Sequence, residues 1–341
     1  MPPQKGVSFV ASIMTNASAL TALQSLNATN RALESTQARI STGYRVAEAS
    51  DNAAYWSIAT TMRSDNQALA TVQDSLGLGA AKVDTAYTAM NKAIETVDAI
   101  KVKIVAAVGA SPAMKIQIQT DITALQYQLK SYADGATFSG TNWMSVNSTT
   151  AAGNPSAGVH ADAKIVSAFN RDASGTVTLG TIDIKVNDVK LYDAAATTAE
   201  TRGMLEGLRL GTTGARDDTA VQAVAGAAVV ALDGYAVSTL TVSGFTDPQV
   251  TQMLKVVETA LSEMINAATV LGSAKKQIDL QKQFTISLMD SIERGVGQLV
   301  DADMNKESTR LQALQVQQQL GIQSLSIANS NAQRVLSLFQ N

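Results

Sequence analysis

Apolar residues recur at helical spacing at both ends of the chain. Leu26, Leu33 and Ile40 follow one another every seven residues near the N-terminus. Near the C-terminus, steps of three and four residues join Leu311, Leu314, Gln318, Gly321, Leu325, Ala328, Ala332, Val335 and Phe339. This spacing places the side chains on one face of a helix. We therefore predict amphipathic helices over residues 11–42 and 301–341.

Both terminal helices are weak on their own. Their apolar faces also contain Gln, Gly and Ala, and no charged residue occurs from Gly6 to Asn30. From Leu311 onward, Arg334 is the one charged residue. Exposed helices normally carry charges, and a thin apolar stripe does not hold an isolated helix together, so we expect both helices to be buried against neighbouring molecules. The predicted packing residues are Leu20, Leu26, Leu33, Ile40, Leu311, Leu314, Leu325, Val335, Leu336 and Phe339.

Two longer helical patterns lie between the terminal ones. The apolar rhythm runs from Ala53 to about Val108 and again over residues 248–300. A further helix is predicted from Met114 to Tyr132, completing an N-terminal helical part over residues 53–136. The long helices come from opposite chain ends, so they must meet in space to bury their apolar faces. The pattern predicts a mainly α fold, a long antiparallel coiled-coil rod built from both chain ends.

A short polar stretch, residues 43–52, separates the first terminal helix from the first long helix. Gly43 follows Thr42 at a position where helices commonly end in a left-handed conformation. Ser50 or Asp51 is placed to cap the amides of the next helix, which begins near Asn52. The sequence thus predicts a joint between two helices.

The middle of the chain, residues 137–247, is rich in Gly, Ser, Thr and Asp and contains short β-like runs. Ile182 and Ile184 alternate with polar residues, and Asn187-Asp188 is a turn signal before Val189. This pattern predicts a hairpin that turns at Asn187. We expect a small β-containing insert at the far tip of the rod, and we expect the rod to tolerate its exchange for a linker.

Composition excludes several function classes. The net charge of -3 and the pI near 5.3 provide no basic face for nucleic acid or for an anionic membrane. The chain has no Cys and one His, His160, so it offers neither a disulfide nor a multi-His or Cys metal site. There is no run of 18 apolar residues.

Isolated motifs do not assemble into an active site. GLGAAK, from Gly77, lacks the third Gly and the preceding strand of a dinucleotide loop, and we interpret its glycines as a close helix contact or a bend. DADMNKES, from Asp301, has Lys and Gln where a calcium loop needs Gly and Glu. SAKK, from Ser273, stands without its companion motifs. We expect Trp56 and Trp143 to be packing anchors, and we expect no enzyme activity, cofactor or metal.

The residues on both sides of the insert resemble bacterial flagellin. ISTGYRVAEASDNAAYWSIA, from Ile40, is similar to the family's N-terminal joint. LGSAKKQIDLQ, SIERGVGQLVDADMNKES and the terminal NAQRVLSLFQ are similar to its C-terminal half. The resemblance covers about residues 11–146 and 249–341 and is to flagellins of the alphaproteobacterial kind. Residues 1–10 are extra, and are either a misassigned start or a real extension.

The resemblance implies a structural subunit that is exported unfolded and polymerises into the extracellular flagellar filament for swimming. The terminal helices would form an inner tube, the long helices an outer tube, and the joint the spoke between them. The joint residues carried over in this way are Gly43, Arg45, Asp51 and Asn52. At Tyr44, Asn52, Tyr55 and Trp56 the chain departs from the commoner Leu, Asp, Gly and Gln.

The resemblance also implies partners and leaves two alternatives. The partners would be further copies of the chain, sibling flagellins, hook-associated and cap proteins, and the export apparatus with its chaperone, without nucleic acid or membrane. One alternative is the hook-filament junction protein, which shares the terminal helices. The other is a surface flagellin homologue that binds polysaccharide through its insert, although the insert's aromatic residues are few and scattered.

Overall fold

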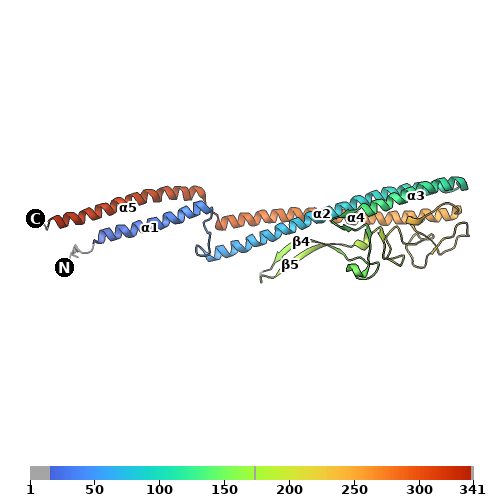
Figure 1. The fold of residues 1–341 in the computed structure, drawn as a ribbon, viewed down its shortest axis with the longest axis horizontal. Coiled ribbons are helices and arrows are strands. Elements are labelled where there is room, and N and C mark those ends of the chain that lie inside the picture. The colour runs from blue at the N-terminus through green and yellow to red at the C-terminus, as the bar shows by residue number, and fades with distance from the viewer. Residues whose placement is uncertain (1–15, 173, 339–341) are drawn as a thin grey trace, which may run out of the picture. The chain divides into compact units, whose positions relative to one another are not determined.

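The computed structural model describes residues 16–172 and 174–338, and long helices dominate these residues (Figure 1). The helices are α1 (Ala17–Thr42), α2 (Ala53–Ala107), α3 (Pro112–Gly135), α4 (Asp247–Val300) and α5 (Met304–Leu338). The chain divides into two compact units, here called the terminal unit (residues 1–66 and 290–341) and the central unit (residues 67–289). The predicted mainly α class is confirmed. The predicted extension, residues 1–10, lies outside the described residues.

In the central unit, α2 and α4 each bury one face with a seven-residue repeat. The fully buried residues at this spacing are Leu76, Val83, Met90, Val97 and Ile104 on α2, and Val250, Val257, Met264, Leu271 and Ile278 on α4. The helices are antiparallel, because Lys101 Nζ lies 3.2 Å from Glu258 Oε1 and Lys275 Nζ lies 2.6 Å from Asp84 Oδ1. The repeat is that of a coiled coil, as the apolar pattern predicted.

Helix α3 joins the same core through Ile122 and Leu129, which are fully buried. It begins two residues earlier than its predicted start at Met114. Ser111 Oγ accepts a hydrogen bond from the Met114 amide at 3.4 Å, and Pro112 occupies the first turn, where no backbone donor is needed. The cap and the proline together set this boundary.

The insert, residues 137–247, contains short strands in four small sheets. Its strands are β1 (Thr137–Phe138), β2 (Thr141–Asn142), β3 (Ser145–Val146), β4 (Ala163–Arg171), β5 (Val177–Ile184), β6 (Tyr192–Asp193), β7 (Arg209–Leu210), β8 (Val221–Gln222) and β9 (Asp233–Tyr235). Antiparallel pairs are β1–β2, β4–β5 and β7–β9, whereas β3–β6 and β8–β9 are parallel. Among the strands that the structure describes, only β4 and β5 are long, and they form one hairpin.

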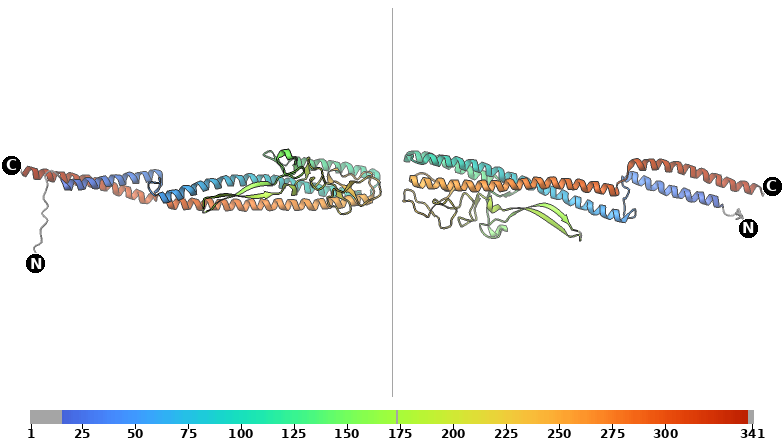
Figure 2. Two further views of the ribbon diagram at one scale, coloured as in Figure 1. Left: turned by 90° about the horizontal axis from the view of Figure 1, so that it is seen from below. Right: turned by 180° about the vertical axis from the view of Figure 1, so that it is seen from behind.

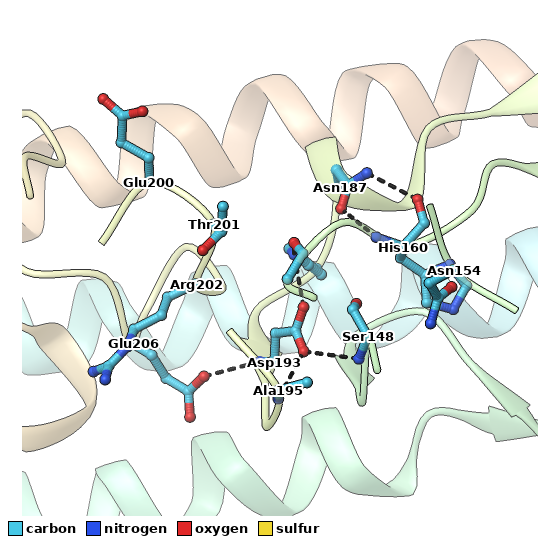
Figure 3. A network of polar contacts seen from close by, with 12 residues as sticks. Ser148, Asn154, His160, Asn187, Asp193, Ala195, Glu200, Thr201, Arg202 and Glu206 are labelled. Atoms are coloured by element: carbon cyan, nitrogen blue, oxygen red, sulfur yellow. Dashed lines mark hydrogen bonds and ion pairs between the residues drawn. The ribbon is translucent and has the colours of Figure 1, made fainter. Parts of the chain in front are cut away.

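The predicted hairpin turn at Asn187 is wrong. The real turn lies at the other end of β5, where Asp172 Oδ1 accepts hydrogen bonds from the amides of Ser174 and Thr176, and Gly175 has a φ of 86°. Residues 186–188 form a 3-10 helix instead. There Asn187 exchanges hydrogen bonds with the backbone of His160 (Figure 3), at 2.9 Å in each direction. A turn-forming residue therefore bridges two loops of the insert.

The insert extends along the helices, as the β4–β5 hairpin in Figure 2 makes visible. Ile165 on β4 and Ile182 on β5 share one apolar core with Leu76 on α2. Further along the chain, Leu191, Leu205 and other insert residues enter the same core. The insert is thus more than a cap at the tip of the helices. It supplies one side of the core of the central unit.

Buried polar contacts also tie the insert to this core. Arg209 is fully buried, and its guanidinium contacts both carboxylate oxygens of Glu263 on α4, at 3.0 and 2.7 Å. Burial raises the pKa of Glu263, but the hydrogen bonds and charge of Arg209, with the charge of Arg216, outweigh it and hold this pKa below its ordinary value. Lys190 Nζ lies 2.7 Å from Asp193 Oδ2, both buried. Asp193 also accepts from the Ser148 and Ala195 amides (Figure 3).

Two glycines on α2 provide a matched test of this packing. A Cβ on Gly79 would lie 2.5 Å from Ile165 Cγ2, whereas a Cβ on Gly77 would meet nothing within 4 Å. Gly77→Ala should therefore stabilise the chain by about 0.5–1 kcal/mol through helix propensity. Gly79→Ala should destabilise it, because Ile165 is branched at Cβ and must move. Thermal unfolding of both variants by circular dichroism measures the difference. Equal stability of the two would refute the close contact.

Candidate functional site

Helices α1 and α5 form an antiparallel pair in the terminal unit. Three polar contacts mark their register. Asn16 Nδ2 donates to the Ala328 carbonyl at 3.0 Å, Gln318 Nε2 donates to Asn30 Oδ1 at 2.9 Å, and Arg39 Nη1 lies 3.5 Å from Glu307 Oε1. Arg39 lies at the C-terminal end of its helix and Glu307 at the N-terminal end of its helix, where their charges favour the helix dipoles.

Most of the predicted packing residues line the seam between α1 and α5. Leu26, Leu33, Ile40, Leu311 and Leu325 are partly buried, and Leu314 is buried. A Cβ on Gly321 would lie 3.1 Å from Leu26 Cδ1, so the helices approach closely there. Leu20 faces away and is 59% exposed. The side chains of Val335 and Leu336, and the whole of Phe339, lie outside the described residues.

The sequence reasoning missed a second set of apolar residues on this pair. These residues lie off the seam and expose between 43% and 61% of their surface: Leu23, Val316, Leu320, Ile322 and Ile327. The seam itself holds many small and polar residues, such as Thr36, Gln318 and Gly321. The pair therefore turns several of its larger apolar side chains outward. Reading each helix for one apolar face hid this signal, because the outward residues lie at positions outside the seven-residue repeat.

The joint, residues 43–52 together with 301–303, is held by backbone hydrogen bonds between its two chain segments. The amides of Arg45 and Val46 donate to the Val300 carbonyl at 2.7 and 3.2 Å, and the Ala302 amide donates to the Gly43 carbonyl at 2.9 Å. Arg45 Nη2 donates to the Leu299 carbonyl at 2.9 Å. Gly43 has a φ of 77°, the left-handed conformation predicted for it.

Asp51 and Asn52 order the second half of the joint. Asp51 Oδ2 accepts from the amides of Ala47 and Glu48 at 2.9 and 3.2 Å. Asn52 Oδ1 accepts from the amides of Ala54 and Tyr55, both at 3.1 Å. The predicted cap at Ser50 or Asp51 is therefore wrong, because Asn52 caps α2 while Asp51 closes the preceding turn.

A small apolar cluster lies under the joint, formed by Val46, Ala59, Val296 and Val300. At the start of α5, Asp303 Oδ1 accepts from the amides of Asn305 and Lys306 at 3.0 and 3.2 Å. The run that resembled a calcium loop is thus a helix cap. Among the described residues, no three His, Cys, Asp or Glu side chains are grouped so that they could hold a metal ion.

Aromatic residues surround the joint. The Arg63 guanidinium lies 4.7 Å from the centre of the Tyr44 ring, a cation-π contact. Tyr55 and Trp56 are 41% and 38% exposed. Trp143 is 7% exposed, as expected of a packing anchor. The same expectation was wrong for Trp56, which projects from the first turn of α2.

The candidate site thus consists of helix faces, helix caps and a backbone-bonded joint. None of the helices over the described residues combines the length and the hydropathy that a membrane-spanning helix needs.

Comparison with known proteins gives one consistent result. Residues 13–149 match the family model of the bacterial flagellin N-terminal helical region, and residues 254–339 match that of the C-terminal helical region. Flagellin C of Rhizobium meliloti (strain 1021) is 47% identical over 340 residues, which cover 96% of this chain and 99% of the relative. The flagellin of Brucella melitensis biotype 1 is 47% identical over 331 residues, which cover 97% of this chain and 100% of the relative.

Proposed function

Since this chain belongs to the bacterial flagellin family and is a structural subunit of the extracellular flagellar filament, we propose that its terminal unit carries the contacts between subunits. The observation that supports the proposal is the apolar outer surface of the α1–α5 pair. Leu320 and Ile327 are 57% and 61% exposed in the single chain. Large exposed apolar side chains on a pair with few charges are typical of a surface that another molecule covers.

We assign a role to each part of the chain. Residues 11–42 and 301–341 form the core tube, the joint is the spoke, and residues 53–136 and 248–300 form the outer tube. The insert, residues 137–247, faces solvent. Gly43, Arg45, Asp51 and Asn52 hold the spoke, and the seam residues described above keep α1 and α5 together so that their outer faces can contact other subunits.

The proposed partners follow from the same roles. Further copies of the chain and sibling flagellins would occupy the filament lattice, and cap and hook-associated proteins would contact its ends. The export apparatus and a chaperone would handle the chain before assembly. Flagellins are structural proteins, and we propose that this chain has no enzyme activity. No observation favours the junction protein or the polysaccharide-binding homologue.

Substitution of the outer face tests the proposal. Leu320→Asp should leave the monomer folded, because Leu320 is exposed, but it should block polymerisation by placing a carboxylate in a buried contact at a cost of several kcal/mol. Tyr127→Asp is the matched control, since Tyr127 is 74% exposed on α3. Circular dichroism monitors the fold, and electron microscopy after seeding monitors assembly. If Leu320→Asp filaments form as readily as the control, the outer face is not the contact.

Filament shape provides a prediction for the joint. Gly43→Ala places a Cβ in a left-handed conformation, at a cost of about 1 kcal/mol per subunit. A Cβ there meets no atom within 4 Å, so backbone strain is the whole effect. A filament whose subunits choose between packing states of similar energy responds to such a bias.

We expect Gly43→Ala filaments of near-normal length that are straight or differently coiled, and cells that swim poorly. Gly109→Ala is a suitable control, because Gly109 also has a positive φ, 73°, with no atom within 4 Å, but lies in the central unit. Electron micrographs and swimming speed provide the measurement. A wild-type waveform for Gly43→Ala would leave the joint a passive linker.

A further inference from the structure

Two surfaces outside the helix pair have no described role, and their chemistry is complementary. The first is the aromatic knob, defined here as Tyr55 and Trp56 at the start of α2. These side chains are 41% and 38% exposed. Residues 53–62 contain no charged side chain. Exposed Tyr and Trp side chains on a stretch of helix without charged residues are typical of the centre of a protein interface.

The second surface is the α2–α4 groove, an open groove of about 960 Å³ in the central unit. Its apolar walls include Ile265, Leu280 and Phe284, which are 49%, 56% and 60% exposed. The volume is at the upper end of the range of about 300–1,000 Å³ that suits compact ligands. The groove therefore has room for more than one bulky side chain. Exposure of its apolar walls to water is unfavourable, so covering them would stabilise a complex.

The polar groups of the groove also suit an aromatic guest. Asn91, Gln277 and Gln281 line it with amide groups, and Lys276 contributes one positive charge. An amide oxygen can accept from the indole N–H of Trp or the hydroxyl of Tyr, and an ammonium group is attracted to the face of an aromatic ring. A groove with apolar walls, amide partners and one cation thus matches both the apolar bodies and the polar ends of Tyr55 and Trp56.

Filament geometry identifies the occupant. A helical filament is built from heterologous contacts, in which one surface of a subunit meets a different surface of the next. The knob and the groove are two different surfaces of one chain, and a filament of identical copies offers each knob a groove. We propose that the aromatic knob of one subunit docks into the α2–α4 groove of a second copy. This contact is separate from the one proposed for the α1–α5 pair.

The absence of Cys from the sequence makes cross-linking a clean test. Trp56→Cys and Ser273→Cys, the second in the groove, are purified separately and mixed before seeded assembly and oxidation. The dissolved filaments should show disulfide dimers on a non-reducing gel, and neither variant assembled alone should. A mixture of Tyr127→Cys and Ser273→Cys is the control and should give none. Dimers in the control at the same yield, or none in test filaments that electron microscopy shows to have formed, would overturn the proposal, whereas assembly of Trp56→Cys as ready as that of the unmodified chain would show that the knob is not a contact.

Fluorescence provides a readout that leaves the knob intact. The chain has two Trp residues, and Trp143→Phe leaves Trp56 as the one tryptophan, which can be excited selectively over the Tyr residues. Trp56 emission should shift to the blue on polymerisation, and acrylamide should quench it less in the filament than in the monomer. Unchanged emission and quenching would mean that Trp56 stays in water, which would overturn the proposal.

Filling the groove provides a third test. Ser273→Trp should raise the monomer concentration needed for assembly by roughly tenfold or more, as expected for loss of a central interface contact. Circular dichroism checks that the variant monomer is folded before its assembly is compared with that of the unmodified chain. Trp56→Ala is measured alongside Ser273→Trp, because it removes the side chain that would enter the groove. Normal assembly of both variants would overturn the proposal, whereas failure of Leu320→Asp alone would concern the α1–α5 contact.

Discussion

A chain that ends at Arg310 is expected to form no filaments while its central unit stays folded. Removal of residues 311–341 takes away nearly all of α5, and with it Gly321, the close neighbour of Leu26 on α1. A single amphipathic helix with a thin apolar stripe is marginal in water. The large core cluster of the central unit contains no residue beyond Ile278. The truncation should therefore abolish assembly without unfolding the monomer.

The measurement combines circular dichroism, sedimentation and electron microscopy of the purified chain after seeding. We expect a soluble, mostly helical monomer that does not polymerise at any accessible concentration. A chain that lacks residues 2–10 is the control, because these residues lie outside the flagellin pattern and should be dispensable for assembly. Filaments from the chain that ends at Arg310 would refute a role of α5 in subunit contacts.

The sequence predicted the helices well because their apolar repeat is physically simple. Val83, Met90 and Val97 are seven residues apart, and a coiled coil buries such residues whatever else the chain does. Gly43 was equally predictable, since a left-handed helix end excludes most other residues. These features depend on local geometry and on one periodic face, which a single sequence contains in full.

The insert was harder to predict, because its contacts are long-range. Asn187 is a good turn residue, yet it pairs with the backbone of His160, 27 residues earlier. Arg209 has the character of a surface residue, and only the fold brings Glu263 to its guanidinium. Nothing in the local sequence marks either pairing. The Asp172 turn could have been found, because its Ser and Gly follow at the spacing that such turns use.

The candidate site was predicted in part for a related reason. The seam of α1 and α5 follows the apolar repeat, and the sequence assigned its residues to contacts with other molecules. The chain instead uses Leu26 and Leu314 largely for its own helix pair, and leaves Leu320 and Ile322 exposed. A periodic face predicts that a helix packs, but it does not say whether the partner is the same chain.

Exchange of residues 147–244 for a short linker is now expected to unfold the central unit, although the sequence suggested that the insert could be replaced. The exchange would remove many side chains from the core. Those with at most 1% exposure include Ile184, Val186, Val189, Leu191, Leu205, Tyr235, Val237 and Val242. Full burial of one such side chain contributes about 1.5–3 kcal/mol. For these eight side chains the loss is about 12–24 kcal/mol, which is as large as or larger than the whole stability of about 5–15 kcal/mol that is typical of a domain.

A second deletion separates loss of the core from loss of the insert as such. Exchange of residues 170–178 for Asn-Gly shortens the β4–β5 hairpin at its exposed end, where Asn170, Arg171 and Val177 face solvent, and keeps Ile165 and Ile182 in place. The unfolding temperature of this variant should lie within a few degrees of that of the full chain, and the variant should polymerise. The larger exchange should instead give an aggregated or molten chain. Thermal unfolding by circular dichroism and electron microscopy compare the two. The helices keep their own apolar repeat in both variants. Filaments from the larger exchange would therefore mean that α2, α3 and α4 form a core that is stable enough for assembly without the insert.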